Sequence, residues 1–253
     1  MTDDDGRLRL YCFHHAGAGS LAFGAWQQRL GPRVEVVAVP LPGRDARFGE
    51  PRITEVAALH SELRTIVDHR PGRPYALYGH SMGGLIAQHI AAQWRRFAAE
   101  PPRLAVIGAS QPPDAPVPVL GTGAPREEAL LELISHSSAR TLPDAVLRRY
   151  VLPVLRDDLT LARALRAAAR PAEVPLLAVS GEADPLADAA TMAGWSRWTL
   201  AGLTERTVPG DHYFVGDQPL TDLLTQVLEP LNTGWVTASA PHDSSSIGWE
   251  TAS

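Results

Sequence analysis

The 253-residue sequence contains no lysine, and all 23 of its basic residues are arginine. The absence of lysine excludes Schiff-base catalysis, a serine–lysine dyad and the phosphate-binding lysine of a P-loop. Arginine cannot replace lysine in these roles because it stays protonated and cannot act as an amine nucleophile or base. Any chemistry must therefore come from serine, histidine, aspartate, glutamate or cysteine side chains.

Cysteine, positive charge and long apolar stretches are also scarce. The single cysteine, Cys12, cannot form an intrachain disulfide. The formal net charge of -5 argues against a nucleic-acid partner, because phosphate backbones bind strongly positive surfaces. No apolar run approaches the roughly 18 residues of a membrane span, and the acidic start MTDDDGR does not resemble a secretory signal. We therefore expect a cytoplasmic, soluble protein with neither a nucleic-acid nor a membrane partner.

Short apolar segments alternate with helical patterns along the chain. The predicted strands cover residues 8–13, 34–39, 75–78, 104–110, 174–180 and 204–208. Several of them are almost continuously apolar, as expected for parallel strands that are covered on both faces. Near the end of the chain, an apolar stripe over residues 220–231 predicts an amphipathic helix. Strands that alternate with helices predict an α/β fold with a mostly parallel, doubly wound sheet.

One interval between predicted strands is much longer than the others. It predicts an insertion at about residues 111–172 with helices at 126–137 and 143–170, the latter interrupted by Pro153. Long excursions at strand ends often form lids over active sites, and Leu152, Val154, Leu155 and Leu159 are candidates to line an acyl chamber beneath it. We expect one domain over residues 1–231, lid included, and a flexible tail at 232–253.

A serine between two glycines stands where the third predicted strand becomes a helix. The segment Gly79-His80-Ser81-Met82-Gly83 fits the pattern G-x-S-x-G. A sharp strand-to-helix turn strains the central residue and brings backbones close together, so glycine is needed on both sides. The turn raises the serine above the carboxyl edge of the sheet, facing the positive end of the helix dipole. This context favours Ser81 as a nucleophile over an idle serine in a glycine-rich turn.

A nucleophilic serine needs a base, and the base needs a carboxylate that orients it. After this kind of turn the acid and then the histidine follow later strands. Asp184 follows the fifth predicted strand and His212 the sixth, so we expect them to meet Ser81. Asp211 and Glu182 are rival acids. The other histidines are expected to be packed or solvated: His14, His15, His60, His69, His80, His89, His136 and His242. No cluster has metal-ligand spacing, so we expect neither a metal nor a cofactor.

Acyl transfer also needs hydrogen-bond donors for the oxyanion. The Met82 backbone N–H comes directly after the nucleophile and is the first expected donor. The second should come from the loop HHAGAGS after the first strand, whose small residues allow close approach of a substrate. The Ala16 N–H is the preferred candidate and the Gly17 N–H the alternative. The loop can also be a plain turn without a ligand role.

Six segments together resemble the type II thioesterases of polyketide and nonribosomal peptide biosynthesis. They are FHHAGAG (13–19), VPLPGRDARFGEP (39–51), GHSMGG (79–84), LPVLRDDL (152–159), GEADP (181–185) and PGDHYF (209–214). The sequence departs from the family pattern at His14, where proline is frequent, and at Ala18 and Asp211, where glycine is usual. The resemblance implies an α/β-hydrolase fold with a helical lid. It also implies an editing enzyme that hydrolyses acyl groups from the phosphopantetheine arm of carrier proteins.

The resemblance also implies roles for individual residues. Ser81 would be the nucleophile, Asp184 and His212 its partners, and Ala16 and Met82 the oxyanion donors. The implied partner is an acyl-loaded acyl or peptidyl carrier protein, and nothing in the sequence demands an oligomer, so we expect a monomer. Two other functions stay open: an acyltransferase or cyclase that uses the same acyl-enzyme, and a catalytically idle, lidded binding module.

Overall fold

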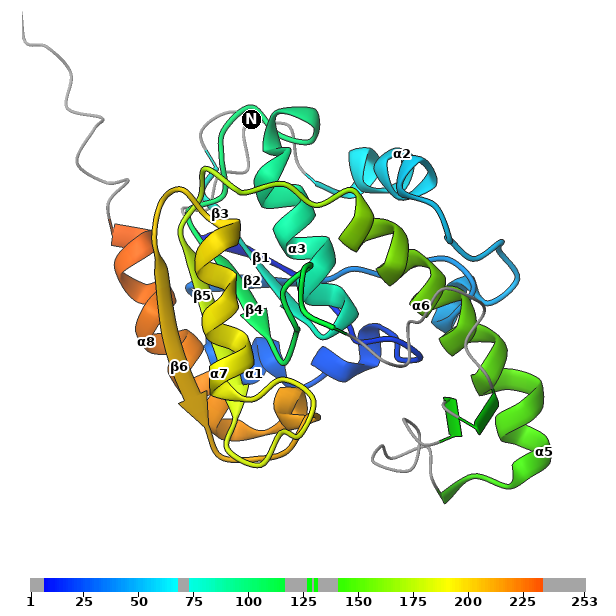
Figure 1. Cartoon of the computed structure of the whole chain (residues 1–253). Helices are drawn as coiled ribbons and strands as arrows, with labels where there is room; N and C mark the ends of the chain where they lie inside the picture. Colours follow the sequence, from blue (N-terminus) through cyan, green and yellow to red (C-terminus); the bar gives the residue numbers. More distant parts are fainter. Residues whose placement is uncertain (1–6, 68–72, 117–126, 129, 132–140, 234–253) are drawn as a thin grey trace, which may run out of the picture.

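The computed structural model describes residues 7–67, 73–116, 127–128, 130–131 and 141–233 (Figure 1). Within this part, six parallel strands form one sheet in the order β2-β1-β3-β4-β5-β6. The strands are β1 (Leu8–Phe13), β2 (Val34–Ala38), β3 (Tyr75–His80), β4 (Ala105–Gly108), β5 (Leu176–Gly181) and β6 (Leu203–Val208). Each lies within two residues of its predicted bounds at either end. The predicted parallel α/β architecture is confirmed.

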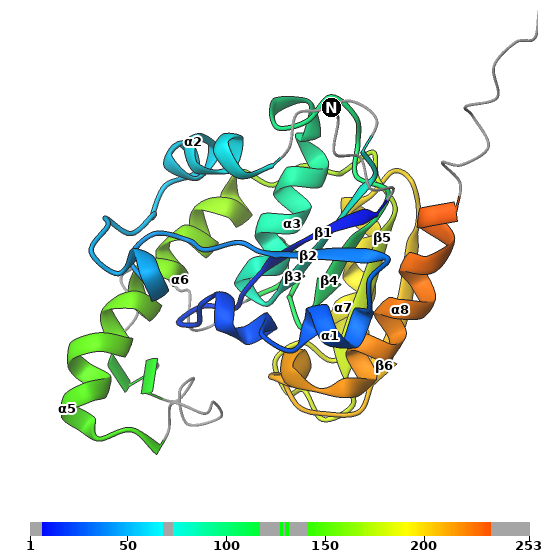
Figure 2. The same ribbon diagram turned by 180° about the vertical axis from the view of Figure 1, so that it is seen from behind.

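Helices cover both faces of the sheet (Figures 1 and 2). They are α1 (Trp26–Leu30), α2 (Val56–Ile66), α3 (Met82–Ala92), α5 (Asp144–Val146), α6 (Leu152–Ala167), α7 (Ala189–Met192) and α8 (Gln218–Thr233). Short 3-10 turns occupy Ser20–Phe23, Asp45–Arg47, Trp94–Arg96, Ala193–Trp198 and Phe214–Gly216. Apolar side chains of α1 and α8 pack on one face, and those of α2, α3, α6 and the segment beginning at α7 pack on the other. The sheet is therefore doubly wound.

Strand β1 illustrates why the strands read as nearly continuous apolar runs. Leu10 and Cys12 point into the layer that contains α1 and α8, whereas Tyr11 and Phe13 point into the layer that contains α3. Side chains alternate between the two faces of a strand, and here both faces are covered, so all four are at most 1% exposed. Cys12 packs as a small apolar residue.

The segment between β4 and β5 carries a long helix in its second half. Pro153 was expected to interrupt this helix, and the α-helical hydrogen-bond pattern does change directly before it. Residues Leu147–Val151 form a π-helical turn, and α6 then begins at Leu152 with Pro153 in its first turn. Proline is tolerated there because the first N–H groups of a helix have no intrahelical acceptor. Farther along, Leu161 and Leu165 of α6 join the buried layer around α3.

Two predicted segments lie wholly or largely outside the described residues. Of the predicted helix at 126–137, only residues 127, 128, 130 and 131 are described, and all four are helical. Helix α8 runs to Thr233, two residues past the predicted domain end at 231, and the rest of the predicted tail lies outside the described residues. Among the helices that are described, none combines the length and the apolar character needed to cross a membrane.

Candidate active site

Ser81 occupies a strained turn between β3 and α3. Its backbone angles are φ 53° and ψ −115°, in a region that residues with a side chain rarely adopt, at a cost of about 1–3 kcal/mol. The Ser81 N–H donates a hydrogen bond to the Gly108 carbonyl at 2.8 Å, which ties the turn to β4. A Cβ on Gly79 would lie 1.9 Å from the Gly83 carbonyl oxygen, and one on Gly83 would lie 2.0 Å from the Phe13 carbonyl oxygen. Both glycines are therefore needed where strand and helix meet.

The structure brings the side chains of Ser81, His212 and Asp184 into one hydrogen-bonded chain. His212 Nε2 lies 3.2 Å from Ser81 Oγ, and His212 Nδ1 lies 2.9 Å from Asp184 Oδ2 and 3.1 Å from Oδ1. Asp184 is 4% exposed and His212 is 8% exposed, so the pair is largely removed from water. This geometry allows a proton to pass from the hydroxyl group to the ring while the carboxylate orients the ring.

The Asp184 carboxylate is held by its own loop as well as by His212. Its Oδ1 accepts the backbone N–H groups of Leu186 at 2.8 Å and Ala187 at 3.0 Å. Burial acts to raise the pKa of Asp184, but the hydrogen bonds from His212 and the two backbone groups outweigh it and hold the pKa below its usual value. The described carboxylate contacts of the His212 ring are with Asp184, and the rival acid Asp211 accepts the Tyr213 N–H at 2.8 Å.

His80, expected to be a packed histidine, contacts the backbone of His212. Its Nε2 lies 2.7 Å from the His212 carbonyl oxygen, and its Nδ1 lies 2.8 Å from the Tyr78 hydroxyl. Because the His80–carbonyl contact requires an N–H on Nε2, the Tyr78 hydroxyl donates to Nδ1. Burial, followed by the neighbouring His15 and His212, lowers the pKa of His80 well below its usual value. His80 thus buttresses the His212 loop, a role that its position beside Ser81 does not reveal.

The predicted oxyanion loop after β1 is held by groups from distant parts of the chain. The Gly17 N–H donates to Asp158 Oδ2 at 2.8 Å, and the Ala18 N–H donates to the His15 carbonyl at 3.2 Å. Arg44 donates to the Ala18 carbonyl at 3.0 Å and pairs with Asp158 through both of its terminal nitrogens. Neither Arg44 nor Asp158 was identified from the sequence, because Asp158 is 141 residues away from Gly17.

A small apolar cluster lies between this loop and the inserted helices. It contains Leu130, Leu147, Leu152, Leu155 and Leu159, with Ala16, Leu131 and Val151 packed against it. Three of the four residues expected to line an acyl chamber are therefore in one cluster with the loop residue Ala16. The fourth, Val154, is buried but lies outside this cluster.

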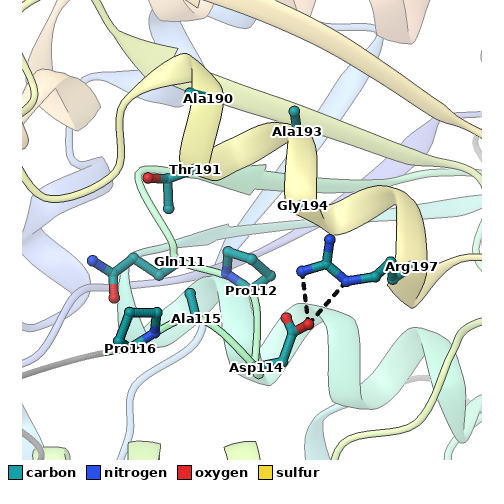
Figure 3. Close-up of a pocket in the computed structure, with 10 residues that line it drawn as sticks. All are labelled: Gln111, Pro112, Asp114, Ala115, Pro116, Ala190, Thr191, Ala193, Gly194 and Arg197. Atoms are coloured by element: carbon teal, nitrogen blue, oxygen red, sulfur yellow. Dashed lines mark hydrogen bonds and ion pairs between the residues drawn. The ribbon is translucent and has the colours of Figure 1, made fainter.

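Figure 3 shows a hollow of about 510 Å³ whose lining does not include Ser81. It is formed by the loop after β4 and by the helical segment that begins with α7, and its lining includes Gln111, Pro112 and Thr191. The ion pair between Arg197 and Asp114 closes one side at 2.6 Å. None of the predicted site residues lines it. No group of three potential metal ligands occurs in the part of the chain that the structure describes.

In the part of the chain that the structure describes, burial lowers the pKa of five buried or half-buried histidines below its usual value. Burial, followed by the neighbouring His14 and His212, lowers the pKa of His15 to about 3. Burial, followed by His60 and two arginines, lowers the pKa of His89 to about 4. Burial also lowers the pKa of His14, of His60 and, as described above, of His80. His89 lies 2.8 Å from His60 through their Nε2 atoms, which joins α3 to α2. The folded protein therefore holds these rings neutral where an unfolded chain would bind protons.

We expect the free energy of unfolding to fall as the pH decreases from about 6.5 toward about 4. The folded pKa of each ring lies below its unfolded value, so the unfolded state binds more protons and stability rises with pH. His15 and His89, whose pKa values in the folded protein are about 3 and about 4, each contribute up to about 1.4 kcal/mol per pH unit within this window. Urea unfolding over this pH range measures how the unfolding free energy changes with pH. His89→Gln should reduce that change by the contribution of one titrating histidine. An unfolding free energy that does not change across the window contradicts the prediction.

Comparison with known proteins identifies the family. The family model described as "Thioesterase domain" matches residues 8–233. The chain belongs to the thioesterase family. Thioesterase PikA5 of Streptomyces venezuelae is 33% identical over 218 residues, which cover 83% of this chain and 76% of the relative. The linear gramicidin dehydrogenase LgrE of Brevibacillus parabrevis is 29% identical over 218 residues, 83% of each chain.

A solved structure agrees with this assignment. The RedJ thioesterase from the prodiginine biosynthetic pathway in Streptomyces coelicolor is 35% identical, with a TM-score of 0.74. The match covers 88% of this chain and 90% of RedJ. The resemblance to type II thioesterases inferred from the six motifs is confirmed, as is the α/β-hydrolase fold. The protein is a hydrolase that acts on thioesters, although the name of LgrE describes a dehydrogenase.

Proposed function

We propose that this thioesterase releases acyl groups from carrier proteins through an acyl-enzyme on Ser81. The observation that carries the proposal is the position of His212, whose ring lies 3.2 Å from the Ser81 hydroxyl and 2.9 Å from the Asp184 carboxylate. His212 takes the hydroxyl proton as Ser81 attacks the thioester carbonyl, and Asp184 stabilises the resulting imidazolium. His212 then protonates the departing thiolate. Water, activated by the same ring, attacks the acyl-enzyme and releases a free acid.

The oxyanion formed in both steps needs two donors. The Met82 N–H is the first, at the start of α3, where the helix dipole adds a positive field. The HHAGAGS loop supplies the second. Its Gly17 and Ala18 N–H groups are already bonded to Asp158 and to the His15 carbonyl, so the Ala16 N–H is the donor that we assign. This choice favours Ala16 over the alternative, Gly17.

The substrate class that we propose is an acyl chain on the phosphopantetheine arm of a carrier protein in polyketide or nonribosomal peptide biosynthesis. The support comes from the names of relatives. RedJ is described as a thioesterase from the prodiginine biosynthetic pathway, and GrsT of Aneurinibacillus migulanus, which is 28% identical, is named as a gramicidin S biosynthesis protein. The apolar cluster that Ala16 joins beneath α6 offers an apolar surface for an acyl chain beside the loop. The enzyme would act in the cytoplasm as a monomer.

Turnover of an acyl-loaded carrier protein tests this function. We expect free acid as the product and, in rapidly quenched reactions, an acyl adduct on the peptide that contains Ser81, because the chemistry passes through an ester of that residue. Mass spectrometry of protein and products measures both. A product that carries the acyl group on an added amine or alcohol instead of water would indicate an acyltransferase or cyclase. The absence of turnover and of a Ser81 adduct would contradict the proposal.

A further inference from the structure

Helix α6 places two leucines and one aspartate against the HHAGAGS loop. Leu155, Asp158 and Leu159 are three and four positions apart, so they share one face of the helix. The two leucines belong to the cluster against which Ala16 packs, and Asp158 accepts the Gly17 N–H at 2.8 Å. In Figures 1 and 2 α6 passes beside the blue segment that follows β1.

The Asp158 carboxylate is fixed in place by Arg44. The guanidinium donates from Nη1 to Oδ2 at 2.8 Å and from Nη2 to Oδ1 at 2.7 Å, and the two side chains are 7% and 1% exposed. Such a bidentate pair has a defined geometry, unlike a single contact between flexible chains. The same Arg44 Nη1 also donates to the Ala18 carbonyl. The loop is therefore held at two backbone groups directly after Ala16.

We propose that Asp158, oriented by Arg44, is a positioning residue that sets the direction of the Ala16 N–H toward the oxyanion. This inference rests on the proposed function, because it assumes that Ala16 is an oxyanion donor. The loop has only small side chains at residues 16–19, and Gly17 adopts φ 79°, so its own side chains do little to fix its path. The contacts from α6 and Arg44 supply that constraint. A donor displaced by about 1 Å loses much of its effect on the transition state.

Anchoring of the lid alone does not account for this arrangement. Asp157, the adjacent residue, already ties α6 to the loop after β2 through an ion pair with Arg52 at 2.6 Å. That pair is about one-third exposed and has no contact with the HHAGAGS loop in the described structure. A buried pair is also weak evidence for stability, because an apolar replacement is often neutral or stabilising. The feature that distinguishes Asp158 is the hydrogen bond that it accepts from Gly17.

Three variants separate positioning from lid anchoring. Arg44→Met/Asp158→Leu removes both charges together, so no unpaired charge stays buried, and it removes the acceptor for Gly17. Arg44→Gln/Asp158→Asn also removes the charges but keeps a carbonyl oxygen that can accept the same N–H. Asp157→Asn breaks only the neighbouring ion pair. Thermal unfolding of each variant establishes that it is folded before kinetics are measured.

We expect kcat to fall about 10²-fold in Arg44→Met/Asp158→Leu with little change in KM, because the lost interaction acts in the transition state. Arg44→Gln/Asp158→Asn should recover most of this loss, and Asp157→Asn should keep kcat near the parent value. Phosphonylation of Ser81 by a fluorophosphonate should slow in parallel with kcat, since its phosphoryl oxygen occupies the oxyanion site.

Two results would overturn the inference. One is a folded Arg44→Met/Asp158→Leu enzyme that is phosphonylated and turns over at the parent rate. The other is a change confined to KM, which indicates that the pair only anchors the lid. Failure of the proposed function looks different, because the parent protein itself would then show no fluorophosphonate label on Ser81.

Discussion

Replacing Ser81 with alanine is expected to lower kcat for a thioester substrate by about 10⁴-fold or more. The variant keeps the turn between β3 and α3 but has no oxygen to attack the carbonyl, so only substrate binding and the oxyanion donors continue to act. Steady-state hydrolysis of an acyl thioester, followed by thiol release, measures the effect. Ser61→Ala is a matched control, because Ser61 is an exposed serine on α2 whose hydroxyl, among the described residues, bonds to the Ala57 carbonyl of its own helix alone.

A double variant tests whether the three side chains act as one unit. His212→Gln alone should lower kcat by an amount similar to Ser81→Ala, and the double variant should be no slower than either single variant. The reason is that each step proposed for His212 acts on the Ser81 hydroxyl, 3.2 Å from its Nε2, or on the acyl ester of Ser81, so that without Ser81 the ring has nothing left to activate. If the double variant lost kcat by the product of the two single-variant factors, the acyl-enzyme mechanism would be contradicted. Appreciable turnover by Ser81→Ala would contradict it as well.

Replacing Gly79 with alanine is expected to destabilise the fold by about 4 kcal/mol or more. The new methyl group would lie 1.9 Å from the Gly83 carbonyl oxygen, 2.2 Å from its carbon and 2.5 Å from the Gly84 nitrogen. All three atoms belong to the backbone of the first turn of α3, so no side chain can rotate away to make room. Urea unfolding measures the loss.

The matched control is Gly49→Ala. A Cβ at Gly49 would meet no atom within 4 Å, and its backbone does not require a positive φ. We expect a change within about 0.5 kcal/mol at this exposed position. A Gly79→Ala protein that keeps both the parent stability and the parent kcat would show that α3 and β3 can separate without cost, which contradicts the tight junction described here.

Much of the fold could be predicted because the decisive signals are local. The strands were found from short apolar runs, which arise because helices cover both faces of the sheet. Strand ends moved by at most two residues, for example from 174 to Leu176 in β5. The sequence indicated a break at Pro153 but not its form, which is a π-helical turn followed by a new α-helix with the proline in its first turn, where it costs little.

In the candidate site, the three reactive side chains could be predicted from the sequence, but the contacts that hold them could not. Chain order and strand ends were sufficient to nominate Ser81, Asp184 and His212, because the carboxyl ends of neighbouring parallel strands meet at one edge of a sheet. The contacts that support them were not predicted. His80 reaches a carbonyl 132 residues away, and Asp158 reaches an N–H 141 residues away.

By itself, the sequence determined which reactive groups this thioesterase has and in which order they occur, and its lack of lysine excluded amine chemistry. The short apolar runs of the strands and the glycines around Ser81 are local patterns, so they can be recognised without coordinates. Only the tertiary structure showed that Asp158 accepts a hydrogen bond from the Gly17 N–H and that His80 donates one to the His212 carbonyl. Such contacts depend on how α6 and the His212 loop pack against distant strands, and no local pattern encodes that packing.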